Sequence, residues 1–176
     1  MGTNNILAFR NDRFGEFLLT IPALRVLKQS YPEVKLDLVV DKNVLPIAER
    51  IPFINRLIVW ENRKHSLGEI LKFSQELKHG RYDLSVAFNP SQEFNMISFL
   101  SGIPIRAGYD RKWGFLLNRK IKDTKELGLK HEVDYNLELL KAASNLHLRG
   151  AVFCSSEGYD LGNNGFPLEI KQSDFP

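Results

Sequence analysis

Short apolar runs alternate along this chain with segments in which apolar residues recur at a helical spacing. Five runs are typical of strands: residues 6–9, 34–40, 56–60, 83–88 and 103–107. Five segments have helical periodicity or helix start and stop signals: residues 17–27, 44–50, 66–79, 91–101 and 132–145. In the third of these, Ser66 and Glu69 form the pattern of a capping box, and Gly80 follows the last turn.

This alternation favours an α/β fold with a Rossmann-like parallel sheet and helices on both faces, because parallel strands are usually joined by helical crossovers. Pro104 cannot donate a ladder hydrogen bond, so the fifth strand is expected at an edge or entering the sheet late. Residues 108–120 are basic and aromatic without a clear period and are expected to form a loop. We assign residues 1–145 to the Rossmann-like domain and residues 146–176 to a linker or tail.

The first strand leads into the stretch around which the chain is organised. Polar residues from Arg10 to Arg13 follow the strand, then come Gly15 and Glu16, and an apolar helix continues from there. In open α/β sheets, ligands bind beyond the carboxyl ends of the strands, where the helix N-termini point. Asp12, Arg13 and Glu16 are therefore expected at the edge of the sheet where ligand-binding and catalytic residues usually lie.

Composition narrows the class of protein. Of the 176 residues, 43% are hydrophobic, which is enough to form a core. The net charge of +3 is too weakly basic to indicate nucleic-acid binding by itself. The single cysteine, Cys154, excludes an internal disulfide. We expect no signal peptide, and no apolar run approaches the roughly 18 residues that would span a membrane.

No cofactor is expected from the residues. The four histidines lack the spacing of metal ligands, so we predict no metal site. The first strand is not followed by Gly-x-Gly-x-x-Gly or a phosphate-loop pattern, which disfavours a dinucleotide or nucleotide role for this domain.

A longer pattern covers the first helix and is followed by further matches along the chain. In order, the matching residues are Arg10-x-Asp12-x-x-Gly15-Glu16-x-x-x-Thr20-x-Pro22-Ala23-Leu24, Tyr82-Asp83, Gly102-Ile103-Pro104-x-Arg106-x-Gly108-Tyr109-Asp110, Leu116-Leu117-Asn118 and His131-Glu132-Val133. In order and spacing, this pattern resembles glycosyltransferase family 9, the bacterial ADP-heptose:lipopolysaccharide heptosyltransferases. The matches span about residues 5–145.

The resemblance implies a GT-B architecture, in which two Rossmann-like domains face each other across a cleft. The N-terminal domain takes the lipopolysaccharide-core acceptor and the C-terminal domain takes the nucleotide-sugar donor. Family members are nearly twice as long, so the resemblance implies that residues 1–145 are the acceptor-binding domain and that residues 146–176 lead toward a donor-binding domain missing here. The expected activity is inverting transfer of heptose or a related sugar, in the cytoplasm, with the inner-membrane surface as a further expected partner. The isolated domain is expected to be inactive.

The resemblance also implies a catalytic base. The family carries Asp in its Gly-Asp motif, whereas this chain has Glu16. A Glu carboxylate can accept the acceptor's hydroxyl proton, but its side chain is longer by one methylene, about 1.5 Å. Asp12 is therefore the second candidate, and loss of activity in a degenerate member is a further alternative. Without the resemblance, Glu16 would be interpreted as a carboxylate that complements a helix dipole.

Basic and polar residues near the predicted carboxyl ends are the candidates for substrate binding. Arg10 and Arg13 could grip acidic groups of the acceptor, with a salt bridge to Asp12 or Glu16 as the alternative. Gly15 is expected to need a positive φ or close approach to a ligand, or else to pack helix on strand. The other candidates are Arg63, Lys64, Asn89, Arg106, Arg111 and Lys112, for which a solvated loop or a turn stays the alternative.

Two other functional classes stay open. A mixture of basic and aromatic residues can bind single-stranded nucleic acid, but the fold context favours sugar and phosphate, and we expect no nucleic-acid partner. A non-catalytic flavodoxin-like binding or regulatory module also alternates strands and helices over about this length. It usually needs an acidic pocket or a phosphate loop, and the first turn here is instead rich in arginine.

Overall fold

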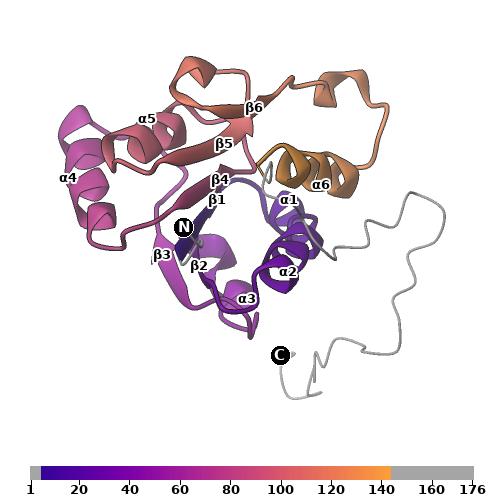
Figure 1. Cartoon of the computed structure of the whole chain (residues 1–176), viewed down its shortest axis with the longest axis horizontal. Coiled ribbons are helices and arrows are strands. Elements are labelled where there is room, and N and C mark those ends of the chain that lie inside the picture. Colours follow the sequence, from indigo (N-terminus) through magenta and orange to yellow (C-terminus); the bar gives the residue numbers. More distant parts are fainter. Residues whose placement is uncertain (1–4, 144–176) are drawn as a thin grey trace.

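The computed structural model describes residues 5–143, which form one parallel sheet with helices on both sides (Figure 1). The predicted linker, residues 146–176, lies outside the described residues. The strands are β1 (Asn5–Arg10), β2 (Lys35–Val40), β3 (Arg56–Val59), β4 (Leu84–Ala87), β5 (Ile105–Tyr109) and β6 (Arg119–Ile121). The helices are α1 (Phe14–Leu18), α2 (Ile21–Ser30), α3 (Leu45–Ala48), α4 (Leu67–Lys78), α5 (Gln92–Leu100) and α6 (Glu132–Ala143). Short 3-10 turns are η1 (Lys42–Val44), η2 (Gly114–Leu116) and η3 (Lys125–Leu127).

The helices cover both faces of the sheet, which confirms the predicted fold class. α4 and α5 lie on one face, and α1, α2, α3 and α6 lie on the other (Figure 1). Successive residues of β1 point to alternate faces: Ile6 and Ala8 pack with the second group of helices, and Leu7 and Phe9 with the first. All four are fully buried. A strand covered on both faces is apolar at every position, which is why β1 reads as a continuous apolar run.

The strand order is β3-β2-β1-β4-β5-β6, and every neighbouring pair is parallel. This is the order of a Rossmann sheet, whose direction of winding reverses between β1 and β4. In a flavodoxin-like sheet β1 lies between the second and third strands, whereas here it lies between β2 and β4. The described strands therefore do not support a flavodoxin-like module.

Of the expectations about the second half of the sheet, one is partly confirmed and one is wrong. β5 is an inner strand and not an edge strand, but it enters the sheet late, at Ile105, so that Pro104 precedes the first paired residue and its missing N–H interrupts no ladder bond. Residues 108–120 are not a single loop, because Gly108 and Tyr109 complete β5 and Arg119 begins β6 at the edge of the sheet. A three-residue strand is too short to produce a recognisable alternation.

The predicted first helix is divided into α1 and α2 at Leu19 and Thr20. Pro22 has no N–H and would remove a hydrogen bond from the interior of a continuous helix, whereas in the first turn of α2 it is tolerated. Thr20 Oγ1 donates to the carbonyl of Glu16 at 2.8 Å, in the place that the backbone N–H of Thr20 would take in a continuous helix. The break leaves Glu16 on a short helix of its own, α1.

The capping box predicted for α4 is confirmed, since Ser66 and Glu69 exchange both capping hydrogen bonds. In α6, Leu140 and Ala143 are buried, whereas Val133 and Leu137 are only partly buried. The other buried residues of α6 are Tyr135, Asn136 and Leu139.

Candidate functional site

The carboxyl ends of β1 and β4 meet at the point where the winding of the sheet reverses, which is the usual ligand position in such folds. Arg10, the last residue of β1, donates from Nη1 to the carbonyl oxygen of Phe88 at 2.8 Å. Asn89 Nδ2 donates to Asn11 Oδ1 at 3.3 Å, and Asn11 Nδ2 donates to the carbonyl of Trp60 at 3.1 Å. These bonds tie together the ends of β1, β3 and β4.

Arg10 lies at the centre of a group of charged side chains. Its Nε is 2.8 Å from Asp12 Oδ1, and its Nη2 is 2.7 Å from Glu16 Oε2 and 3.5 Å from Glu132 Oε1. Glu132 also forms an ion pair with Lys125. We call Arg10, Asp12, Glu16, Lys125 and Glu132 the Arg10 cluster. Because the Arg10 side chain is only 1% exposed, it presents almost no surface to a ligand and instead orients the carboxylates around it.

The two predicted bases differ in their surroundings. Burial raises the pKa of Asp12 despite the attraction of Arg10, and the repulsion from Glu16 adds to this effect. Asp12 Oδ1 is buried and lies beside Arg10 Nε without hydrogen-bond geometry, so this contact is Coulombic. Glu16 is held by a true hydrogen bond from Arg10, and its Oε1 lies 3.7 Å from Nη2 of the exposed Arg13. Glu16 therefore has one oxygen oriented by a buried cation and the other on the solvent side.

Gly15 lies on the open side of α1. Its φ is not positive, so that expectation is wrong. Packing of helix on strand is also not the reason for the glycine, because an added Cβ would meet no heavy atom within 4 Å. Close approach of a ligand stays a prediction, and the free space above Gly15 is compatible with it.

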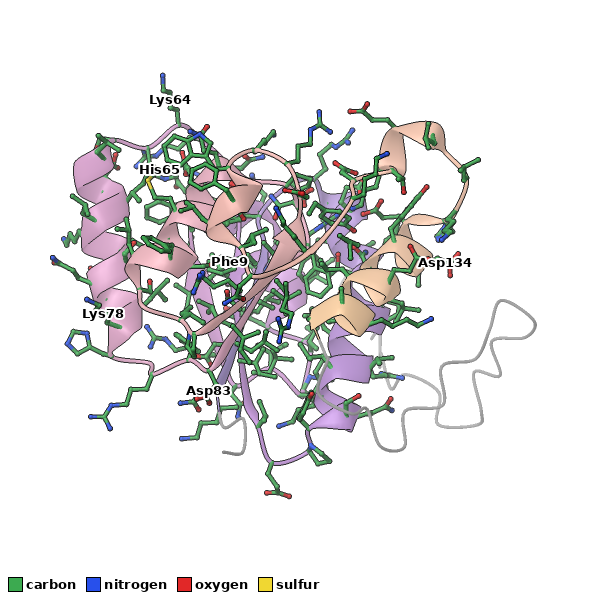
Figure 2. The ribbon with its side chains drawn as sticks, turned by 45° about the horizontal axis from the view of Figure 1, so that its top comes forward. Phe9, Lys64, His65, Lys78, Asp83 and Asp134 are labelled. Carbon is green, nitrogen blue, oxygen red and sulfur yellow. The ribbon has the colours of Figure 1, made fainter. Side chains whose placement is uncertain are left out.

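A groove of about 340 Å³ lies between the end of β3 and α4, and Trp60, Arg63, His65 and Phe73 are among its lining residues. His65 is buried, stacks on Trp60 with ring centroids 3.9 Å apart, and has Nδ1 2.9 Å from Glu93 Oε2. Figure 2 shows His65 beside Lys64 at one end of α4, with Lys64 extending outward. The groove is joined to the first turn through the bond from Asn11 to Trp60.

The predicted cations near this groove differ in their engagement. Arg63 Nη2 is 2.6 Å from Glu69 Oε1, and Arg63 Nε is 3.5 Å from Glu61 Oε2. The hydrogen bond from Arg63, together with those from Ser66, lowers the pKa of Glu69 to about 2. Arg63 is thus paired with carboxylates, whereas Lys64 is exposed to solvent.

The segment after β5 carries the next pair of candidates. Arg111 Nη1 lies 3.1 Å from Asp123 Oδ2 and 2.8 Å from Glu126 Oε1. Lys112 is exposed and has a φ of 48°, and Trp113 follows with a φ of 68°. Two successive left-handed residues with side chains are strained and need support from their surroundings. Asn95 supplies some of it by donating to the carbonyl of Lys112 at 3.0 Å.

Arg106 does not lie with the other candidates. It is the second residue of β5, and therefore lies near the end of the strand opposite to the one that Arg111 follows. Its Nε donates to the carbonyl of Leu116 at 2.8 Å, and its Nη1 donates to that of Ile103 at 2.6 Å.

Glu132 and Lys125 were missed as site residues. Glu132 belongs to the His131-Glu132-Val133 match, but it is 122 residues from Arg10 in the sequence. Only the placement of α6 beside the carboxyl edge brings it to Arg10. Among residues 5–143, no three His, Cys, Asp or Glu side chains form a group able to hold a metal ion. No helix in this part of the chain is long and apolar enough to cross a bilayer.

Several known proteins are similar in sequence to this chain over most of its length. No protein-family model matches the chain. A Haemophilus influenzae protein named as a glycosyltransferase is 29% identical over 143 residues, covering 81% of this chain and 41% of that protein. Lipopolysaccharide heptosyltransferase 2 of Escherichia coli is 24% identical over 149 residues, covering 80% of this chain and 43% of the enzyme.

Solved structures agree with these matches. The E. coli ADP-heptose lipopolysaccharide heptosyltransferase II superposes with a TM-score of 0.67 at 25% identity, covering 77% of this chain and 39% of that structure. A family 9 glycosyltransferase from Veillonella parvula shares the fold with a TM-score of 0.68 at 20% identity, covering 82% of this chain and 42% of that structure. The chain thus spans about two fifths of the length of these relatives. In sequence and in fold, this chain resembles the glycosyltransferases of family 9.

Proposed function

We propose that this chain is the acceptor-binding domain of an inverting glycosyltransferase that moves heptose, or a related sugar, from a nucleotide-sugar onto the lipopolysaccharide core. The observation that carries the proposal is Glu16, a half-buried carboxylate held at 2.7 Å by a fully buried arginine where the winding of the sheet reverses. The resemblance to heptosyltransferases supports the choice of sugar and acceptor. In this proposal the donor binds to a second domain, and transfer needs both domains.

Glu16 acts as the general base. The acceptor hydroxyl attacks the anomeric carbon of the donor, its proton passes to Glu16, and the nucleoside diphosphate leaves from the opposite face with the bonding electron pair. One C–O bond forms while the anomeric C–O bond to phosphate breaks, and the configuration is inverted. We choose Glu16 over Asp12 because Glu16 stands in the Gly-Asp position of the similar family and its Oε1 lies beside the exposed Arg13, whereas Asp12 Oδ1 is buried against Arg10 Nε.

The remaining candidates divide by exposure. Arg10 positions the base and does not touch the acceptor, since its side chain is 1% exposed. Arg13, Lys64 and Lys112 are exposed and can reach acidic groups of an acceptor. Arg63, Asn89 and Arg111 already hold protein partners, which a ligand would have to displace or share. Contact with the inner-membrane surface, from the cytoplasmic side, would use the same exposed cations.

The experiment that tests the function starts from the longest protein encoded by the reading frame that contains this chain. The purified protein is incubated with ADP-heptose and a deacylated Kdo-containing acceptor, and the product is identified by mass and by the configuration of its new linkage. We expect one heptosyl residue to be added with inversion. Residues 1–176 alone are the matched control and should give no transfer. Absence of transfer from every nucleotide-sugar tried would overturn the proposal and leave a binding module as the better description.

A further inference from the structure

α6 holds the proposed base from two directions. Glu132 and Asn136 are four residues apart on this helix and therefore lie on one face of it. Glu132 Oε1 reaches Arg10 Nη2 at 3.5 Å, and Arg10 Nη2 in turn binds Glu16 Oε2 at 2.7 Å. Asn136 Nδ2 donates to the carbonyl of Leu19 at 3.1 Å, at the junction between α1 and α2.

The second contact reaches the backbone of Glu16. Asn136 Nδ2 also lies 3.4 Å from Thr20 Oγ1, and Thr20 Oγ1 donates to the carbonyl oxygen of Glu16 at 2.8 Å. Asn136 and Thr20 are both fully buried, so water does not compete for these bonds. One face of α6 thus restrains the side chain of Glu16 through Arg10 and its backbone through Thr20.

The charges explain why Glu132 is needed beside Arg10. Nη2 of a guanidinium carries two N–H groups that point in different directions, so it can bind one carboxylate on each side. Glu16 and Glu132 occupy these two sides, and Lys125 pairs with Glu132 from beyond. Lys125 Nζ lies 4.5 Å from the centre of the buried Tyr109 ring, so its own position is defined. Without the charge of Glu132, Arg10 can turn toward Glu16 and Asp12, and Lys125 loses its counter-ion.

We propose that Glu132 is a positioning residue for the transfer reaction, which places the carboxylate of Glu16 through Arg10 and takes no proton itself. The inference rests on the proposed function for its kinetic consequence, but its structural content can be measured separately. The charged groups facing Glu16 are Arg10, Arg13 and Asp12 from the first turn, with Glu132 and Lys125 from the segment that includes α6.

The test compares Glu132→Gln with Glu138→Gln in the full-length protein. Glu138 lies on the same helix and pairs with Lys130 away from the cluster, so it is the matched control. Glu132→Gln should lower kcat by about 10- to 100-fold with little change in KM, because small displacements of a reacting group have effects of this size. The control should leave kcat within about twofold. Glu132→Asp, which keeps the charge, should lose less activity, and it replaces Glu132→Gln if that variant does not fold.

A double-mutant cycle separates positioning from a general structural effect. If Glu132 acts through Glu16, Glu132→Gln should cause no further loss of kcat in a Glu16→Gln background. Equal losses in both backgrounds would contradict the inference.

Carbon-13 NMR of the Glu16 carboxyl group at one fixed pH provides a readout that does not need transfer. Its chemical shift should change in Glu132→Gln and stay the same in Glu138→Gln. A chemical shift unaffected by Glu132→Gln would overturn the positioning role. A chemical shift that changes in a protein without any transferase activity would retain the positioning role while contradicting the proposed function.

Discussion

Arg10 and Arg106 are a natural pair for comparison, because both lie on inner strands and both were expected to grip an acidic acceptor. Arg10 ends β1 and faces three carboxylates at the carboxyl edge. Arg106 is near the start of β5, donates to main-chain carbonyls and lies 5.4 Å from the centre of the Phe99 ring. Arg10 lies at the carboxyl end of its strand, where ligands bind in parallel sheets, and Arg106 lies near the amino end of its strand. The position of an arginine along its strand is therefore a better guide to its role than the number of basic residues nearby.

The two arginines also stabilise different parts of the domain. Arg10 connects side chains from β1, α1 and α6 around the proposed base. Arg106 braces the entrance to β5 against the η2 turn, through the carbonyls of Ile103 and Leu116. We therefore assign Arg106 a structural role in place of the predicted contact with the acceptor. Substitutions of the two arginines and of residues that interact with the site should have effects of different size.

Replacing Arg10 should have the largest effect. Arg10→Met leaves three carboxylates and the carbonyl of Phe88 without their shared cation, and breaking a buried ion pair from one side costs about 3–5 kcal/mol of unfolding free energy. Denaturant unfolding of the parent and the variant measures this difference. A loss below about 1 kcal/mol would show that the cluster does not hold this edge of the sheet together.

Replacing Arg106 should cost less and spare the chemistry. Arg106→Met removes hydrogen bonds to main-chain carbonyls of a partly exposed segment, worth about 1–3 kcal/mol of unfolding free energy. The kcat of transfer should stay within about twofold of the parent at a temperature where both are folded. A loss of kcat as large as that of an Arg10 variant would return Arg106 to the site.

Replacing Asp12 should change how the unfolding free energy depends on pH. Because burial raises its pKa above the ordinary 3.8, its contribution to stability is complete below that pH and is lost as the pH rises through the raised value. The parent protein should therefore lose unfolding free energy as the pH rises and Asp12 ionises. The asparagine of the Asp12→Asn variant carries no charge at any pH, so the difference in unfolding free energy, variant minus parent, should increase between about pH 3 and pH 7. Asp134→Asn, on α6 and outside the cluster, is the control. A variant that loses ground to the parent over this range would contradict the raised pKa.

The smallest effect is expected at the groove beside β3. Arg63→Gln removes the main cause of the low pKa of Glu69, which should rise from about 2 toward its ordinary 4.5. The hydrogen bonds from Ser66 remain and should keep it below that value. Carboxyl NMR titration measures the change. An unaltered titration curve would mean that Arg63 is free of Glu69 in solution and available to a ligand.

The sequence predicted the sheet well where strands carry runs of buried apolar residues, as at residues 6–9 of β1 and 38–40 of β2, because burial on both faces favours apolar residues at successive positions. It failed for β6, whose three residues leave no period to detect. For the candidate site, Glu16 and Asp12 could be proposed from the sequence because they closely follow the first strand and Glu16 stands in the Gly-Asp position of the similar family. Glu132 and Asn136 could not be found in this way, because only the packing of α6 against the sheet and α2 brings them to the first turn.

In the proposed reaction, Glu16 takes the proton of the acceptor hydroxyl. The most direct test is the kcat of transfer by Glu16→Gln in the full-length protein, beside Glu33→Gln, whose side chain is exposed before β2. We predict a loss of about 10²- to 10⁴-fold for Glu16→Gln, the usual effect of a lost acid–base group, and unchanged kcat for the control. Equal kcat in the two variants would contradict the assignment of Glu16 and make Asp12 the next candidate for the base.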